Sequence, residues 1–112
     1  MKKTFFASCV IGKDEHETEQ DFTLEYYLIT CRMKEKGSDK FTDIYGIEVI
    51  KKYTDASGNC VSQKSTASNL TTNKKHIYTM LTTLYNQKIT PVCLCEVIDD
   101  VFYEDSLHIL NA

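Results

Sequence analysis

Arginine and proline are almost missing from this sequence, and both shortages are informative. Among its 112 residues there is one proline, Pro91, and one arginine, Arg32, while lysines carry nearly all the positive charge. A single guanidinium argues against clamps in which paired arginine forks grip phosphate or carboxylate groups. The single proline divides the C-terminal third of the chain into two amphipathic segments and so indicates where one helix ends and the next begins.

Several partners and compartments are excluded by what the chain lacks. No apolar run is long enough to cross a bilayer, and a net charge of −3 lacks the basic excess that nucleic-acid backbones select. The apolar stretch after Lys2 and Lys3 is shorter than the roughly 7 to 15 residues of an export signal. We therefore expect a cytoplasmic protein, with no membrane contact and no non-specific nucleic-acid binding, whose five cysteines stay reduced.

Catalytic and cofactor motifs are also missing. The sequence contains no GxSxG, no HExxH and no phosphate-binding P-loop. It has no CxxC pair and no EF-hand spacing, and an odd number of cysteines argues against a closed disulfide framework. Any chain of this length contains Ser, Cys, His and Asp, so their presence alone predicts no triad. We expect a protein that is not an enzyme and that needs no cofactor.

Four strands are predicted from alternating apolar and aromatic residues. In the clearest strand, Tyr45, Ile47 and Val49 share the inward face, and Glu48 and Lys52 point outward. Residues 55–59 suit a type I turn with Gly58 in the left-handed conformation, which closes a hairpin. The strands are expected at residues 4–11, 22–33, 44–53 and 60–65, with a polar loop over 12–20.

The hydrophobic period changes to that of a helix near residue 71. Ile77, Met80, Leu81 and Leu84 form one stripe of a helix over 73–88, with Thr72 or Asn73 as its N-cap. Thr90 and Pro91 have the pattern of an N-cap followed by proline, and predict a second helix that buries Leu94, Val97, Ile98 and Val101.

Together these elements predict one α+β domain over residues 1–112. Its fold class is a four-stranded antiparallel meander covered on one face by two C-terminal helices, in the order ββββαα. A compact domain of this length has a radius of gyration of roughly 13 Å. Residues 1–3 and 107–112 are expected to fray.

Two core segments carry a resemblance to a known family. With the segments 45–52 (YGIEVIKK) and 89–100 (ITPVCLCEVIDD), the chain resembles a family of short clostridial-type bacterial proteins known only as a domain of unknown function. The likeness covers roughly residues 22–103. It implies a cytoplasmic bacterial protein, and it supplies no activity, cofactor or catalytic residue.

Two candidate sites for ions follow from residue type and spacing. Cys93 and Cys95 are soft metal ligands, but residues two apart on a helix point in different directions, so two small buried or half-buried thiols are the alternative. Thr72, Lys74 and Lys75 lie at a helix start, where free N–H groups attract anions and lysines oppose the helix dipole. A solvated helix start with flexible lysines is the alternative there.

Candidate partner-binding residues are Tyr78 and Tyr85, which flank the apolar stripe of the first helix. Aromatic residues at the edge of a core either complete it or extend into an interface. Like charges at Glu96, Asp99 and Asp100, extended by Glu104, form either a solvated face or a site for a basic partner or cation. The leading hypothesis is a non-enzymatic interaction or regulatory module that binds an unidentified protein or itself. A small-anion or metal-ion binding domain is the alternative.

Overall fold

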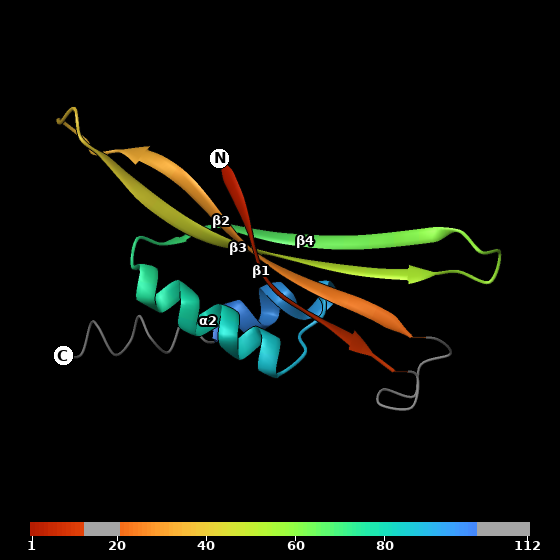
Figure 1. The fold of residues 1–112 in the computed structure, drawn as a ribbon. Coiled ribbons are helices and arrows are strands. Elements are labelled where there is room, and N and C mark those ends of the chain that lie inside the picture. Colours follow the sequence, from red (N-terminus) through yellow and green to blue (C-terminus); the bar gives the residue numbers. More distant parts are fainter. Residues whose placement is uncertain (13–20, 101–112) are drawn as a thin grey trace.

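A single antiparallel sheet, with helices on one face, makes up the structure of this protein (Figure 1). The computed structural model describes residues 1–12 and 21–100. The predicted order ββββαα is confirmed. The elements are β1 (Lys2–Ile11), β2 (Phe22–Lys34), β3 (Phe41–Thr54), β4 (Cys60–Thr71), α2 (Lys74–Asn86) and the 3₁₀ turn η1 (Pro91–Cys93), which continues as a helix over residues 94–100.

The sheet is a meander in the order β1-β2-β3-β4, and every neighbouring pair is antiparallel. The predicted turn over residues 55–59 is confirmed, since Gly58 has a φ of +83° and the Asp55 carboxylate accepts hydrogen bonds from the N–H groups of Ser57 and Asn59. β4 runs to Thr71, six residues beyond the predicted end at 65. As an edge strand that is mostly exposed, it lacks the alternation of apolar residues that marks a half-buried strand. The predicted loop lies almost entirely outside the described residues.

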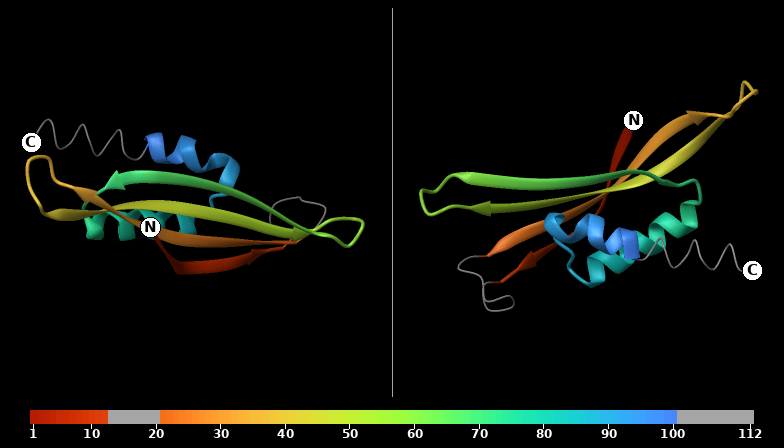
Figure 2. Two further views of the ribbon diagram at one scale, coloured as in Figure 1. Left: turned by 90° about the horizontal axis from the view of Figure 1, so that it is seen from above. Right: turned by 180° about the vertical axis from the view of Figure 1, so that it is seen from behind.

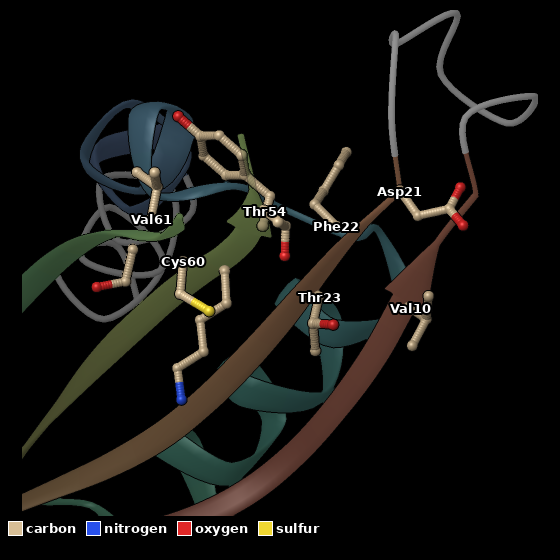
Figure 3. Close-up of a pocket in the computed structure, with 10 residues that line it drawn as sticks. Val10, Asp21, Phe22, Thr23, Thr54, Cys60 and Val61 are labelled. Carbon is tan, nitrogen blue, oxygen red and sulfur yellow. The ribbon is translucent and has the colours of Figure 1, made fainter. Parts of the chain in front are cut away.

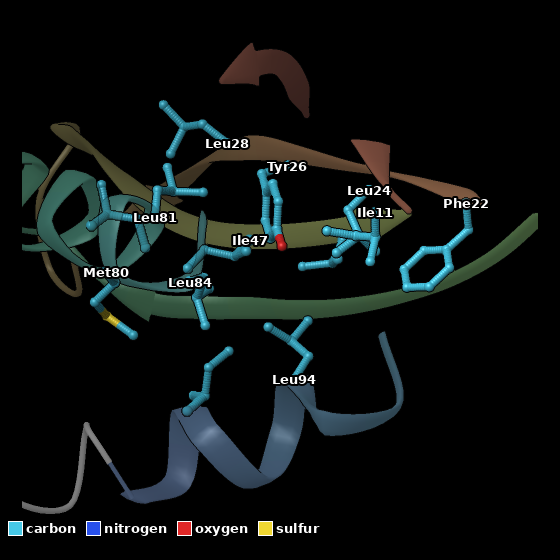
Figure 4. Close-up of a cluster of buried hydrophobic side chains, with 13 residues drawn as sticks. Ile11, Phe22, Leu24, Tyr26, Leu28, Ile47, Met80, Leu81, Leu84 and Leu94 are labelled. Atoms are coloured by element: carbon cyan, nitrogen blue, oxygen red, sulfur yellow. The ribbon is translucent and has the colours of Figure 1, made fainter. Parts of the chain in front are cut away.

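The core lies between the sheet and the helices (Figure 4). All four residues of the predicted α2 stripe are buried, and Leu94 and Ile98 of the second helix are buried with them, while Val97 is half-buried against the same cluster. Val101 lies outside the described residues. From the sheet the cluster receives alternate residues of each long strand: Ile11, Phe22, Leu24, Tyr26, Leu28, Ile47 and Val49.

A bulge in β1 sets which of its side chains meet this core. The pairing with β2 shifts between Phe5 and Ala7, so Phe6 is an extra residue in the strand. Phe6 and Cys9 pack against the core, whereas Phe5 and Val10 are more than half exposed. The bulge therefore decides which residues of β1 after Phe5 face the helices.

Gly46 marks a second irregularity, where β4 changes register against β3. The pairing jumps from Ile47 with Ala67 to Tyr45 with Thr71, and Asn69 in the intervening segment has a φ of +55°. The backbone of β4 passes so close to Gly46 that a Cβ atom there would overlap the carbonyl oxygen of Ala67. This close approach brings the end of β4 to the position from which α2 starts (Figure 1).

The connection between the two helices is fixed to the sheet by Tyr26. Its buried hydroxyl donates a hydrogen bond of 2.9 Å to the carbonyl of Ile89, and its ring meets the ring of Tyr85 edge to face at 6.0 Å. Burial, together with Cys9 and Tyr85, raises the pKa of Tyr26, so the hydroxyl stays neutral and able to donate. Pro91 is buried and opens η1, as predicted, although the side chain of Thr90 makes no capping hydrogen bond.

The molecule is more elongated than its length suggests. The Cα radius of gyration is 16.3 Å and the principal extents are 55 × 31 × 17 Å, so the expected compact value of roughly 13 Å is wrong. The physical reason is visible in Figures 1 and 2: the turns that join β2 to β3 and β3 to β4 extend far beyond the helices, at opposite ends of the sheet.

Candidate functional site

A hollow of about 530 Å³ lies beside the first turn of α2, on the face of the sheet that carries the helices. The strands contribute side chains to the lining of this hollow because alternate residues of β1, β2 and β3 point to this face at their shared end. The antiparallel register puts Lys2 opposite Thr30, and Arg32 opposite Asp43. The lining residues are Met1, Lys2, Thr4, Leu28, Thr30, Cys31, Arg32, Asp43, Tyr45, Lys74 and Tyr78.

Positive charge dominates this basic hollow. Lys2, Arg32 and Lys74 line it with one carboxylate, Asp43, which leaves an excess of two positive charges among its side chains. Within residues 1–12 and 21–100, none of these four groups forms an ion pair. Three cations from β1, β2 and α2 therefore share one concavity with too little negative charge to balance them, which favours binding of an anion.

The start of α2 adds to the positive electrostatic potential of the hollow. Asn73 caps α2, with its side-chain oxygen accepting a hydrogen bond of 3.1 Å from the N–H of His76. No acidic residue lies in the first turn, and the first helical residue is Lys74. A lysine at the positive end of a helix dipole costs a few tenths of a kcal/mol instead of stabilising the helix. Lys74 therefore has no evident structural use at this position.

Two tyrosines form the apolar part of the hollow. Tyr45 is half-buried against the core, and Tyr78 is 38% exposed with its ring 6.0 Å from that of Phe6. The other predicted partner-binding residue, Tyr85, is half-buried against the core and Tyr26. The structure therefore places Tyr78, but not Tyr85, beside the unpaired cations.

The other predicted site residues lie elsewhere. Lys75 lines a separate shallow hollow on the back of α2 with Tyr78 and three threonines, and Thr72 is exposed outside the basic hollow. Cys93 and Cys95 are exposed, so the expectation of buried or half-buried thiols is wrong; they lie at the start of the second helix, away from its buried side. The part of the chain that the structure describes holds no group of three His, Cys, Asp or Glu residues suited to a metal. Glu96, Asp99 and Asp100 are exposed on the second helix, and Glu104 lies outside the described residues.

The helix-free face of the sheet holds a polar network that sequence reasoning did not predict. Glu48 points away from the core, as predicted, but it is only 5% exposed. It forms an ion pair with Lys3 and accepts a hydrogen bond of 2.9 Å from the hydroxyl of Thr66. Lys3 also lies 4.3 Å from the ring centre of Tyr27, whose hydroxyl donates to Glu25. Neighbouring strands thus bury this carboxylate without a helix.

Glu48 makes the stability of the protein depend on pH. Burial raises the pKa of its carboxyl, but hydrogen bonds from Lys3 and Thr66 and the charges of Lys3 and Lys64 outweigh burial, and the pKa lies below its ordinary 4.5. Its contribution to stability is therefore present above that value and is lost as the pH falls through the lower folded-state pKa. We expect Glu48→Gln to flatten the fall in unfolding free energy between about pH 5 and pH 3, measured by urea denaturation.

Asp39→Asn, which removes an exposed carboxylate from the turn between β2 and β3, controls for the change in net charge. The same pH slope in wild type and Glu48→Gln would show that the buried ion pair does not contribute as described.

A second hollow, of about 770 Å³, lies at the opposite end of the sheet. Figure 3 shows Val10, Thr23, Cys60 and Val61 around it, from three different strands. Its two charged side chains are Asp21 and Lys52, and Lys52 forms an ion pair of 3.0 Å with Glu25. Because these two side chains have opposite charges, this hollow lacks the excess positive charge of the first.

Comparisons with known proteins identify a family but no activity. A family model described as a family of unknown function (DUF6514) matches residues 7–104. No curated protein and no solved structure matches the chain. Within the described residues, no helix is long and apolar enough to span a membrane.

Proposed function

We propose that this chain, which belongs to the family of unknown function DUF6514, is a non-enzymatic binding module that holds an anionic group of a partner protein in the basic hollow. The observation that carries the proposal is the convergence of Lys2, Arg32 and Lys74, without ion pairs among the described residues, on one concavity. Of the predicted anion-site residues, Lys74 lines this hollow together with Tyr78, whereas Thr72 and Lys75 lie outside it. Cytoplasmic location and bacterial origin stay predictions.

The energetics favour a group that meets all three cations together. A single exposed ion pair contributes only about 0.2 to 1 kcal/mol. A carboxylate or phosphate can in addition accept two parallel hydrogen bonds from the guanidinium of Arg32, which strengthens and orients the contact. The N-terminus of α2 contributes a partial positive charge beside Lys74. Together these terms favour anions and reject cations at this end of the sheet.

The openness of the hollow favours a group presented by a protein over a free metabolite. Sites for small molecules bury about 70 to 90% of their ligand. Here Lys2, Thr4, Arg32, Lys74 and Tyr78 are all exposed, so the cations lie on the rim of a shallow surface. Exposed tyrosine and arginine side chains are typical of protein interfaces.

Fluorescence anisotropy of a labelled hexaglutamate peptide tests this proposal. We expect the full chain to bind it at low salt, and Arg32→Gln and Lys74→Gln each to weaken binding about 5-fold, the equivalent of about 1 kcal/mol. Lys75→Gln is the matched control, because it removes the same charge from the next residue of α2, outside the hollow. We expect it to change binding less than about 2-fold.

Equal weakening by Lys74→Gln and Lys75→Gln would mean that the peptide senses only the overall charge of α2, and the proposal would fail. Inorganic phosphate decides the alternative function, a small-anion binding domain. If phosphate alone binds the wild-type chain as tightly as the peptide, and Arg32→Gln abolishes that binding, the small-anion alternative is the better description.

A further inference from the structure

The outer edge of β4 is a second surface with unused binding capacity. β4 is the last strand of the sheet, and no described residue pairs with its outer side. The half of β4 next to the turn over 55–59 also extends beyond both helices (Figures 1 and 2). We define the free edge as residues 60–66, which pair without interruption with residues 48–54 of β3. Its outward N–H and C=O groups are available to another strand.

The two edges of the sheet differ in how they are protected. β1 has the bulge at Phe5 and Ala7 and begins with Lys2 and Lys3, and both features discourage pairing with a further strand. The free edge of β4 has no proline, no register shift and one charged residue, Lys64. The edge of β1 therefore carries more of the usual devices against strand addition, and the free edge of β4 carries one, Lys64.

The side chains of the free edge indicate what kind of chain fits it. Most are small or polar and exposed, including Ser62, Gln63 and Lys64. A stable dimer needs about 1,200 Å² or more of buried surface with an apolar centre, which this edge does not offer. Antiparallel pairing of two copies centred at Lys64 would also place like charges directly opposite each other. Main-chain hydrogen bonds to a single extended peptide are the better match.

The charge at the edge identifies the class of peptide. Lys64 lies in the middle of the free edge and forms no ion pair among residues 1–12 and 21–100. A residue directly across a strand pair lies within about 5.5 Å, so an acidic side chain there would be stabilised. The hollow of about 770 Å³ reaches the same edge through Cys60, Val61 and Ser62, and gives a neighbouring side chain a place to bind.

We infer that the free edge of β4 binds an extended, acidic segment of another protein as a fifth strand of the sheet, with a carboxylate opposite Lys64. The unpaired main-chain groups of residues 60–66 provide the affinity, and Lys64 provides the preference for acidic sequences. This inference does not depend on the basic hollow, which lies at the other end of the sheet.

Selection of random octapeptides displayed on phage, with the full chain as bait, tests the inference. We expect selected peptides to be rich in β-branched residues and to contain Asp or Glu. Titration of the ¹⁵N-labelled chain with a synthetic selected peptide is expected to shift the amide signals of residues 60–66. Lys64→Glu is expected to reduce the affinity for that peptide roughly 10-fold. Arg32→Gln, in the basic hollow, is expected to leave the affinity for that peptide unchanged.

Proline substitutions separate main-chain pairing from side-chain effects. Neighbouring residues of an edge strand direct their N–H groups to opposite sides, so one of Ser62→Pro and Gln63→Pro removes an outward donor and the other breaks pairing with β3, while Lys64 stays in place. The variant that keeps the wild-type melting temperature is expected to lose at least about 10-fold in peptide affinity. Wild-type affinity in that variant, shifts confined to residues outside 60–66, or a dimer broken by the same proline would each overturn the inference.

Discussion

Replacing Gly46 by alanine is expected to destabilise the protein by about 3 kcal/mol or more, among the larger effects of a single substitution. A Cβ at this position would overlap the carbonyl oxygen of Ala67 and lie 3.0 Å from the Cα of Ser68. Both neighbours are backbone atoms of β4, so no side-chain rotation relieves the overlap. The two strands must separate, and the pairing that positions the start of α2 is lost with them. Urea denaturation of wild type and Gly46→Ala measures the difference.

Gly37→Ala is the matched control for this prediction. Gly37 lies in the turn between β2 and β3 with a φ of +77°, and a Cβ atom added there would meet no atom within 4 Å. Its substitution costs only the left-handed backbone conformation, about 1 to 2 kcal/mol. If Gly46→Ala is no more destabilising than Gly37→Ala, β4 does not pass as close to Gly46 as described.

Truncation of Leu94 to alanine is the second large expected effect, a loss of about 3 kcal/mol in the free energy of unfolding. Leu94 begins the helix over residues 94–100, is completely buried and belongs to the core cluster (Figure 4). Alanine would leave a cavity between this helix, α2 and the sheet. The cost includes both the lost burial of the side chain and the unfilled space. Thermal and urea denaturation report it.

Val92→Ala provides the comparison, because Val92 lies two residues earlier in η1 and is 84% exposed. We expect its effect to stay within about 0.5 kcal/mol. A loss below about 1 kcal/mol in Leu94→Ala would mean that the second helix does not cover the sheet, contrary to the described core.

The sequence predicted the helices and strands correctly where one side of the element is buried, because burial makes apolar residues recur at a regular spacing. Ile77, Met80, Leu81 and Leu84 share a helical stripe because the sheet covers one side of α2. β4 was predicted too short for the converse reason. Beyond residue 65 most of its side chains are small or polar and none is fully buried, so they show no apolar period, and its pairing depends on a strand that lies nearby only in the folded chain. The elongated shape was not predicted because the two hairpins extend beyond the helices, and the pattern of apolar residues does not show how far a hairpin extends.

The candidate site was predicted in part. Lys74 attracted attention because a lysine at a helix start opposes the dipole, and Tyr78 because it flanks an apolar stripe. Lys2 was considered only as part of a possible export signal, and Arg32 only as a lone arginine. The register of β1 with β2 and the placement of α2 bring both beside Lys74. Once the strands are assigned, the parity of Arg32 with the buried residues of β2 places it on the helix-bearing face. Lys2 lies an odd number of residues from the buried Ile11, so alternation alone would place it on the other face, and only the bulge at Phe6 brings it beside Arg32.

Glu48 shows a different limit of sequence reasoning. The alternation of β3 placed it correctly on the face opposite Ile47, but it gave no indication that the side chain is buried there. An ion pair with Lys3 of β1 and a hydrogen bond from Thr66 of β4 hold the buried carboxylate. Cross-strand partners of this kind depend on register, which a strand pattern alone does not supply.

The most direct test of the account is to map where hexaglutamate binds the ¹⁵N-labelled full chain. The account predicts saturable shifts in the amide signals of residues around the basic hollow, in β1 near Lys2, in β2 near Arg32 and in the first turn of α2 near Lys74. Arg32→Gln should reduce those shifts, and Lys75→Gln should preserve them. Weak shifts spread over lysines throughout the chain, or no shift at low salt, would contradict the existence of an anion-binding site at the start of α2.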